Sequence, residues 1–359
     1  MTLILSEDDV EEVLCMRDCM RVLEETFRDF GLGQAVSRPR THTYTWLEPG
    51  TFYNFKSMDG GVSRYGVHAL RISSEVVQTQ KHFGRLREEK LPRAAGGRYV
   101  GLLLLFDMQT TEPLAIMQEA GIQRMRVGGT SGIAAKYLAR KDAKRVGMFG
   151  TGWQAKPQLE ALSHVRNLEQ VKVYSPNPEN RTRFAAEMAT CFDFPVIAVD
   201  NPREVVQSAD ILVCATNSQE PVFDGNWLQP GQHVNSLQGG ELDEMTHVLA
   251  NLIAVRAVEQ SRHYVQKSAP EIPIHTEKTG SFNKRFESKF ETLGAIIAGL
   301  KPGRANDRDI TLFGGSGTGP SSGLGIQFAA VGKLVYDLAR TRGLGHQIPT
   351  EWLTEVHHP

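Results

Sequence analysis

The segment RVGMFGTGWQA, residues 145–155, joins a short apolar run to a glycine-rich turn. The turn has the form G-x-G-x-x-A, which marks a dinucleotide site when it lies between a strand and a helix. The first glycine permits a tight turn, the second lets the backbone approach a pyrophosphate, and the alanine keeps the helix close to the strand. Backbone amides at the helix start would bind the phosphates. The expected cofactor contacts are therefore Gly150, Thr151, Gly152, Trp153, Gln154 and Ala155.

The sequence after this turn alternates between short apolar runs and amphipathic segments. The apolar runs predict strands at 171–175, 195–199, 211–216, 233–237, 251–255 and 309–313. The segments between them predict helices at 154–163, 178–190, 201–208 and 289–300. Such an alternation is typical of an α/β protein with a doubly wound parallel sheet of the Rossmann type.

The end of the second strand bears on the choice between NAD and NADP. An acidic residue about 20 positions after the fingerprint usually binds the ribose 2′-hydroxyl of NAD. Ser175 occupies that place, and arginines follow at 181 and 183, although both could belong to a solvated helix face. We expect NADP or NAD, with NADP favoured. The further expected cofactor contacts, at the ends of the second and fourth strands, are Ser175, Asn177, Arg181, Thr216 and Asn217.

The first 125 residues differ in character from the Rossmann-type region. Residues 6–30 predict a helix, 40–78 several strands, 80–98 a surface excursion, and 99–118 a hairpin. A glycine-rich loop at 314–325 precedes a closing amphipathic helix at 326–343. We expect a dinucleotide-binding domain over 126–321, and a second α+β domain from 1–125 together with 322–359.

Composition excludes several functional classes. Forty basic residues oppose 41 acidic ones, so no electrostatic footprint for nucleic acid or an anionic membrane surface is present. No apolar run reaches the length of a membrane span, and the acidic N-terminal sequence is not that of a secretory signal. The four cysteines contain no CxxC pair, which predicts neither a disulfide framework nor a metal site. We expect a cytoplasmic protein.

Four stretches of this chain resemble the ornithine cyclodeaminase/mu-crystallin family. They are LLLLFDMQTTEPLAIM with RMRVGGTSGIAAKYLAR; RVGMFGTGWQA; ADILVCATNSQEPVFDGNWLQPGQHVNSLQGGELDEM; and ITLFGGSGTG with IQFAAVGKLVYDLAR. The resemblance implies a Rossmann domain inserted in a second domain that mediates homodimerisation. It also implies NAD(H) or NADP(H) as cofactor and a small amino or imino acid as substrate.

The resemblance assigns a substrate-binding role to one arginine. The family's arginine before its small-residue helix corresponds to Arg126 in RMRVGGTS, with Arg124 as the nearby alternative. In the family this arginine lies near the cofactor and the substrate carboxylate. A guanidinium suits that role because it can form a bidentate pair with a carboxylate.

The family's catalytic lysine has no unambiguous counterpart. It follows a Gly-hydrophobic pair, and in YGVH this position is occupied by His68. Lys56 corresponds to it under a shifted alignment, and Arg71 is a third cationic candidate. Because side chains alternate along a strand, His68 and Arg71 point to opposite faces unless the strand bulges. All three remain catalytic candidates.

The family's catalytic aspartate lies about six residues before a Glu-Leu pair, and Asn235 stands at that place before Glu241-Leu242. Asparagine cannot accept and return a proton, which cyclodeamination requires, although it could orient the nicotinamide. We therefore predict an NAD(P)-dependent amino-acid dehydrogenase or imine reductase. The alternatives are an ornithine cyclodeaminase-type ammonia lyase that recycles NAD and a non-catalytic NADPH or small-ligand binder.

Overall fold

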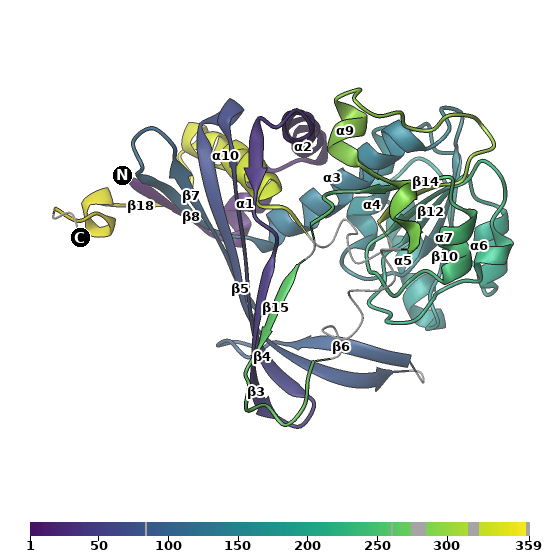
Figure 1. The fold of residues 1–359 in the computed structure, drawn as a ribbon, viewed down its shortest axis with the longest axis horizontal. Helices are drawn as coiled ribbons and strands as arrows, with labels where there is room; N and C mark the ends of the chain where they lie inside the picture. The colour runs from purple at the N-terminus through teal and green to yellow at the C-terminus, as the bar shows by residue number, and fades with distance from the viewer. Residues whose placement is uncertain (83–84, 260, 274–284, 315–322, 357–359) are drawn as a thin grey trace.

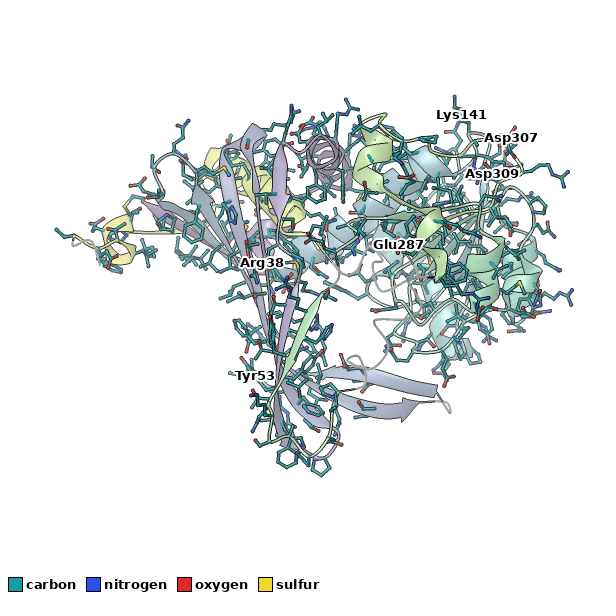
Figure 2. The ribbon with its side chains drawn as sticks, viewed as in Figure 1. Arg38, Tyr53, Lys141, Glu287, Asp307 and Asp309 are labelled. Atoms are coloured by element: carbon teal, nitrogen blue, oxygen red, sulfur yellow. The ribbon has the colours of Figure 1, made fainter. Side chains whose placement is uncertain are left out.

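The structure is a computed structural model that describes residues 1–82, 85–259, 261–273, 285–314 and 323–356. Its elements form two lobes, each built around a β-sheet (Figure 1). Figure 2 places Arg38 and Tyr53 on the sheet of one lobe and Asp307 and Asp309 at the far end of the other.

The Rossmann lobe contains a parallel sheet with the strand order β11-β10-β9-β12-β13-β17-β14-β16. Its strands are β9 (Arg145–Phe149), β10 (Gln170–Tyr174), β11 (Val196–Ala198), β12 (Ile211–Cys214), β13 (His233–Ser236), β14 (Leu252–Val255), β16 (Phe290–Thr292) and β17 (Thr311–Gly314). One face packs against α3 (Ala120–Leu138), α4 (Ala155–Ser163) and α5 (Pro178–Ala189), and the other against α6 (Pro202–Gln207). The helix α7 (Glu244–Leu249) follows β13. The prediction of a doubly wound Rossmann-type sheet is confirmed.

The second lobe, called the sheet lobe below, contains a mixed sheet whose main path is β15-β3-β4-β5-β7-β8-β1-β18. Its strands are β1 (Thr2–Leu5), β2 (Ala35–Ser37), β3 (Thr41–Glu48), β4 (Thr51–Val62), β5 (Val67–His82), β6 (Arg85–Leu91), β7 (Val100–Asp107), β8 (Pro113–Gln118), β15 (Arg262–Val265) and β18 (His346–Ile348). The strand β2 pairs with β4, and β6 pairs with β5. The inner face of this sheet packs against α10 (Gly325–Arg342).

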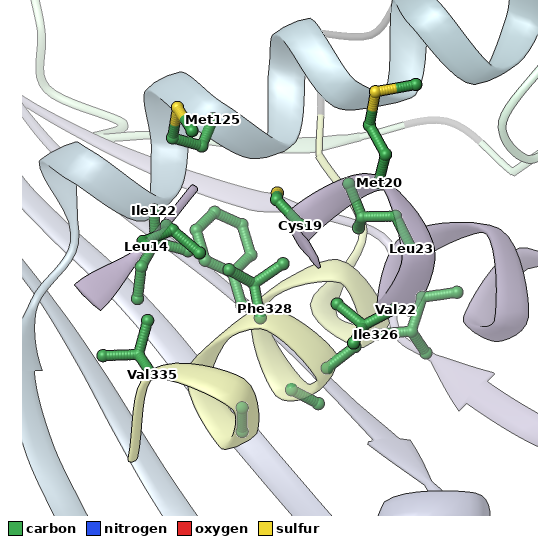
Figure 3. Close-up of a cluster of buried hydrophobic side chains, with 14 of the residues drawn as sticks. Leu14, Cys19, Met20, Val22, Leu23, Ile122, Met125, Ile326, Phe328 and Val335 are labelled. Atoms are coloured by element: carbon green, nitrogen blue, oxygen red, sulfur yellow. The ribbon is translucent and has the colours of Figure 1, made fainter. Parts of the chain in front are cut away.

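The core of the sheet lobe forms where α10 meets the N-terminal helices and α3 (Figure 3). The single helix expected at 6–30 is two helices, α1 (Glu7–Val13) and α2 (Met16–Gly31), because the backbone is extended at Leu14 and Cys15. Helix α10 begins in close contact with β4, since a Cβ on Gly325 would lie 1.9 Å from the Asp59 carbonyl carbon. Helix α10 therefore covers only part of the inner face of the sheet. The part that lies beyond the N-terminus of α10 is not covered by this helix.

Helix α3 is buried on nearly all sides and belongs to both cores. Its Val127 and Ala135 pack with the Rossmann strands, while Ile122 and Ile133 pack with α2 and α10. Gly128 allows close contact, because a Cβ there would lie 2.4 Å from the Pro157 carbonyl oxygen. The expected domain boundary at 125/126 thus falls inside one continuous helix.

Three segments differ from the predictions. The expected surface excursion at 80–98 contains strand β6, which forms a hairpin with the extended β5 and projects from the body of the lobe (Figure 1). Within the expected Rossmann segment, β15 pairs in parallel with β3, so this part of the chain returns to the other sheet. The helix expected at 289–300 is replaced by β16 and the short α9 (Leu293–Ile297). Most of the glycine-rich loop, 315–322, lies outside the described residues.

None of the helices in the described ranges combines the length and apolar character that a membrane span requires. Within the same ranges, no cluster of three or more His, Cys, Asp or Glu residues could hold a metal ion. The cytoplasmic location predicted from the sequence stays a prediction.

Candidate functional site

The glycine turn after β9 has the geometry that its sequence predicts. Gly150 has a φ of 102°, and a Cβ there would lie 2.4 Å from the Ala215 carbonyl oxygen. At Gly152 a Cβ would meet no atom within 4 Å, so the surface in front of this residue is open. Ala155 is fully buried at the start of α4. The first glycine is required by the backbone, and the second leaves room for a ligand.

The amides of this turn are available to an anion. Among the described residues, no hydrogen-bond acceptor contacts the backbone N–H groups of Thr151, Gly152, Trp153 or Gln154. The Gln154 side-chain oxygen is buried without a hydrogen-bond partner. Free N–H groups before a helix are suited to a pyrophosphate, so these residues fit a dinucleotide cofactor.

The two glycines should respond differently to alanine. Gly152→Ala is expected to leave the melting temperature unchanged but to weaken NADH binding by about tenfold or more, because its methyl group enters the space for the pyrophosphate. Gly150→Ala should destabilise the fold by about 1–3 kcal/mol through its positive φ, before any clash is counted. Thermal denaturation and NADH fluorescence titration separate the two effects. A destabilised Gly152→Ala with normal NADH affinity would contradict this assignment.

The end of β10 has no carboxylate in its first three following residues. Ser175 is nearly buried, and its carbonyl oxygen accepts a 2.9 Å hydrogen bond from Arg181. Arg181 also pairs with Asp200 and lies over the Tyr174 ring. Asn177 caps α5 through its side-chain oxygen. Arg181 is thereby held beside the loop that would meet the cofactor ribose.

The ends of β12 and β13 are joined by one buried carboxylate, Glu241. One of its oxygens accepts hydrogen bonds from the amide and hydroxyl of Thr216, at 2.6 and 2.7 Å. The other accepts from the Ser236 hydroxyl and from the amides of Leu237 and Gln238, at 2.8–2.9 Å. Burial raises the pKa of Glu241 to about 7, against the opposing effect of these donors. Sequence analysis used Glu241 only as a marker and missed this positioning role.

Arg126 lies at the carboxyl edge of the Rossmann sheet. Ser131 of α3 contacts Asn235 in the middle of β13, and Leu138 contacts Thr311 at the start of β17. The helix therefore runs antiparallel to the strands, and Arg126 lies toward their carboxyl ends, where α/β proteins bind ligands. Its side chain is fully buried.

The surroundings of Arg126 connect α3 to the start of α10. Its guanidinium donates to the Gln123 side chain at 2.5 and 3.1 Å and to Gln327 at 3.5 Å, and it lies over the Phe328 ring. Burial and the neighbouring charge of Arg71 lower the pKa of Arg126 to about 9. A charged group under these conditions is stabilised by a bound anion.

The pairing between β4 and β5 determines which of the predicted cationic residues lie on the inner face of the sheet lobe, the face on which Arg126 lies. Met58 lies opposite Arg71, and Lys56 lies opposite Ser73, so Lys56 and Arg71 share the inner face. Arg71 is buried, donates to Glu119 at 2.5 Å, and lies over the same Phe328 ring as Arg126. The structure therefore brings Lys56, Arg71 and Arg126 to one region.

His68 points to the other side of the sheet. It is paired opposite Gly61, and its Nε2 lies 3.5 Å from Asp59 on the outer face. The expectation that His68 and Arg71 face opposite ways is confirmed. With this geometry, His68 does not reach the region that contains Lys56, Arg71 and Arg126.

Lys56 forms a buried ion pair with Glu75. Glu75 also pairs with Lys90 at 2.6 Å, and Lys90 is half exposed. Burial lowers the pKa of Lys56 to about 8, even though Glu75 opposes the shift. Burial would raise the pKa of Glu75, but the two lysines outweigh it and lower the pKa to about 2. Lys56 is therefore an amine that can gain or lose a proton near neutral pH.

Asn235 is buried within the Rossmann lobe. Its amide donates to the Ser131 carbonyl at 3.3 Å, and its oxygen lies 3.1 Å from His233. These contacts join β13 to α3 and direct the side chain toward that helix. They indicate a structural role and give no support to the predicted role of Asn235 in catalysis, that of orienting the nicotinamide, which stays a prediction.

Two further arginines near Arg126 were missed by sequence analysis. Arg40 directly precedes β3, and its Nε is buried without a hydrogen-bond partner. Arg256 directly follows β14 and is buried. Burial and the charges of Arg126 and Arg40 lower the pKa of Arg256. Strand periodicity could have found Arg40, because it lies two residues before inward-facing His42.

This fold and turn define a Rossmann-type dinucleotide-binding protein whose second sheet adjoins the cofactor edge. The chain belongs to the ornithine cyclodeaminase/mu-crystallin family, whose model matches residues 1–343. It is 32% identical over 351 residues to an alanine dehydrogenase of Archaeoglobus fulgidus, covering 97% of this chain and 98% of the relative. The resemblance predicted from the sequence is confirmed.

Two solved structures share the whole fold. A Thermococcus litoralis Δ1-pyrroline-2-carboxylate reductase, in complex with NADH and L-proline, has a TM-score of 0.76 and 30% identity, covering 97% of this chain and 100% of its own. An archaeal alanine dehydrogenase dimer with bound NAD has a TM-score of 0.76 and 28% identity, covering 97% and 99%.

Proposed function

We propose that this protein is an NAD(P)-dependent oxidoreductase that acts on the C–N bond of an amino or imino acid. The observation that carries the proposal is the position of Arg126, which lies at the carboxyl edge of the Rossmann sheet and beside inward-facing Arg71. The dinucleotide turn opens on that same edge. The alanine dehydrogenase and pyrroline-2-carboxylate reductase relatives support the same chemistry.

Each side chain has a distinct role in the proposal. Arg126 binds the substrate carboxylate through its guanidinium, and Arg71 with Glu119 fixes the wall of the site. Lys56 donates a proton to the nitrogen during reduction and accepts one during oxidation. Thr216, held by Glu241, positions the nicotinamide end of the cofactor. The bound dinucleotide supplies or accepts the hydride at nicotinamide C4.

The test is absorbance at 340 nm with NADH or NADPH, offered with cyclic imines and with 2-oxo acids plus ammonium or methylamine. Oxidation of the cofactor on any of these substrates supports the proposal. L-Ornithine with catalytic NAD is the parallel assay. Ammonia release without net cofactor change would identify a cyclodeaminase, and tight NADPH binding without turnover on any substrate would identify a binder.

The preference for NADP over NAD is also part of the proposal. It is supported by Ser175 in place of an acid and by Arg181 beside the same loop. We expect Ser175→Asp to raise KM for NADPH by about tenfold or more, because a carboxylate repels the 2′-phosphate and binds a ribose hydroxyl. Thr190→Asp, which adds the same charge at the exposed C-terminal end of α5, is the control. If the ratio of kcat/KM for NADPH and NADH is unchanged in Ser175→Asp, this preference is incorrect.

We further infer that two chains associate through the outer face of the sheet lobe. Its central strands present a set of half-buried apolar side chains that α10 does not cover, namely Leu70, Ile72, Leu102, Leu104, Phe106 and Ile116. An uncovered apolar face of this kind is typical of an interface. The archaeal alanine dehydrogenase is a dimer, which supports the same arrangement here.

A further inference from the structure

Glu119 is a buried carboxylate with one oxygen that no described group of the protein uses. It occupies the N-terminal cap position of α3 and is 6% exposed. Its Oε1 accepts a 2.5 Å hydrogen bond from Arg71, whereas its Oε2 has no hydrogen-bond partner in the described part of the chain. The Nε of Arg71 is likewise buried without a partner among these residues. One ion pair therefore presents both an unused acceptor and an unused donor.

The sheet lobe makes room for the Glu119 side chain with a glycine. A Cβ on Gly101 would lie 2.5 Å from Glu119 Oε1 and 2.6 Å from its Cγ, so the carboxylate fills the space that a side chain on β7 would take. Gly101 pairs with Ser73, and Ser73 pairs with Lys56. Paired residues share a face of the sheet, so the Glu119 carboxylate and Lys56 lie at the two ends of one row on the inner face. The backbones at these ends are two strand spacings apart, roughly 10 Å.

Arg126 approaches the same carboxylate along α3. It follows Glu119 by seven residues, which is two helical turns and roughly 10 Å along the helix axis. Its guanidinium donates to Gln123, one turn nearer to Glu119. Arg71 and Arg126 both lie over the Phe328 ring, at 5.6 and 5.1 Å from its centre. The guanidinium that we assign to the substrate carboxylate and the unused Glu119 oxygen therefore belong to one region of the site.

The chemistry of the unused oxygen defines its ligand. A carboxylate oxygen accepts hydrogen bonds, so the ligand must supply an N–H or O–H group. A buried polar oxygen without a partner is destabilising, and a positively charged N–H group forms the strongest bond to a carboxylate. Amino acids and their iminium ions carry such a group next to a carboxylate. The cofactor edge lies at the Rossmann strands, where Glu241 fixes Thr216, whereas Glu119 contacts β5 and β7 of the sheet lobe.

We propose that Glu119 binds the substrate nitrogen: its Oε2 accepts a hydrogen bond from the N–H of the amino or iminium group, while Arg126 binds the substrate carboxylate. This inference rests on the proposed function, because it assigns a second contact to the same substrate. The two contacts fix the direction in which the carbon of the C–N bond faces the nicotinamide. Glu119 also stabilises the positive charge of the iminium ion, and Lys56 at the other end of the row exchanges the proton.

The experiment compares amino acids with acids that have the same carbon frame but lack the nitrogen. Calorimetry measures binding to the protein–NAD complex of L-alanine and propionate, L-proline and cyclopentanecarboxylate, and L-glutamate and glutarate. We expect at least one amino acid to bind about tenfold more tightly or more than its partner acid, as a charge-assisted hydrogen bond predicts. Glu119→Gln should abolish this preference and leave the affinity for the nitrogen-free acid unchanged. A wild type without the preference, or a variant that keeps it, would overturn the inference.

Asp29→Asn is the matched control for Glu119→Gln. Asp29 is also a buried carboxylate of the sheet lobe that pairs with an arginine, but Arg64 donates to both of its oxygens, at 2.6 and 2.7 Å. This variant should lose stability and keep the preference for the amino acid. Loss of the preference in both variants would assign it to general destabilisation and would also overturn the inference.

Gly101→Ala displaces the same carboxylate without removing a charge. The new methyl group takes the space of the Glu119 Cγ and Oε1, and the extended backbone of β7 accepts alanine at this position. We expect the preference for the amino acid to fall as it does in Glu119→Gln, while NADH affinity stays unchanged. A folded Gly101→Ala protein with the full preference would contradict the position that we assign to Glu119.

Turnover assays separate this inference from the function on which it rests. If the wild type reduces an imine and Glu119→Gln reduces it with the same kcat/KM, Glu119 does not bind the nitrogen and the oxidoreductase assignment stands. If no substrate is reduced, but the preference and its loss in Glu119→Gln are both observed, the oxidoreductase function alone is rejected.

Discussion

Replacing Lys56 with methionine is expected to lower kcat by about 10²- to 10⁴-fold, the usual contribution of a positioned acid–base group. The variant should lower kcat more than the affinity for the cofactor. Lys56 belongs to the sheet lobe, whereas the edge of the Rossmann sheet that would meet the cofactor is fixed by the hydrogen bonds of Glu241 to Thr216. Steady-state kinetics and NADH titration on the same preparation measure both quantities.

Lys90→Met is the matched control for this variant. Lys90 pairs with the same carboxylate, Glu75, but is half exposed, so its removal changes the charge balance without removing the buried amine. We expect its kcat to stay close to that of the wild type. A similar collapse of kcat in both variants would assign the effect to Glu75 rather than to proton transfer by Lys56.

The pH profile gives a second signature of Lys56. Because its pKa is lowered to about 8, the protonated amine required for reduction is present below pH 8 and is lost above it. The kcat/KM for imine reduction should therefore fall as pH rises through 8, while that for amine oxidation should rise up to the same value. Lys56→Met should lose this dependence in both directions, and a profile identical to the wild type would exclude Lys56 as the proton donor.

Glu241→Gln is expected to destabilise the protein by about 2–4 kcal/mol and to weaken cofactor binding by about tenfold or more. Either orientation of the new amide turns its NH₂ toward backbone N–H donors, those of Thr216 or those of Leu237 and Gln238. These donors then lose their acceptor at the edge where the cofactor crosses the sheet. Denaturant unfolding and NADH titration measure the two losses.

Asp243→Asn is the control for Glu241→Gln. Asp243 also accepts several hydrogen bonds, from Thr246 and Gly225, but it caps α7 and makes no contact with Thr216. It should lose stability and keep its NADH affinity. Normal NADH affinity in Glu241→Gln as well would remove Glu241 from the positioning role.

The ionisation of Glu241 gives an additional check on the same variant. With its pKa raised to about 7 from 4.5, the folded protein holds a proton between these values that the unfolded chain has lost. The contribution of Glu241 to the free energy of unfolding therefore decreases as pH rises from 4.5 to 7. That pH-dependent component should be absent from Glu241→Gln.

The Rossmann lobe could be predicted from the sequence because its evidence is local. Each strand is a short apolar run, and the sequence of the glycine turn is enough to predict its backbone geometry, as Gly150 and Gly152 show. The same local evidence predicted that His68 and Arg71 face opposite ways. It could not choose between them, because the choice depends on where α10 and the Rossmann edge lie relative to the sheet.

The missed parts of the site depend on contacts between segments far apart in the sequence. Arg40 and Arg256 are more than 200 positions apart, and no periodicity relates them. The pairing of Lys56 opposite Ser73 follows from the turn between β4 and β5, whose register the alternation of residues does not define. Likewise, the polar segment at 262–265 becomes a strand because β3 offers it an edge.

The sheet lobe is built from segments that are far apart in the sequence, and this affects how the chain folds. Its strand β1 pairs with β18, joining Thr2 to Ile348, and β3 pairs with β15, joining Thr41 to Arg262. During synthesis β1 and the edge of β3 therefore remain without these two partners until much later, whereas the central strands of this lobe and the Rossmann strands can pair before β18 is made. Such non-local pairing slows folding and exposes strand edges. We expect refolding in two kinetic phases, with the Rossmann lobe forming first and the long-range strand pairs of the sheet lobe forming last.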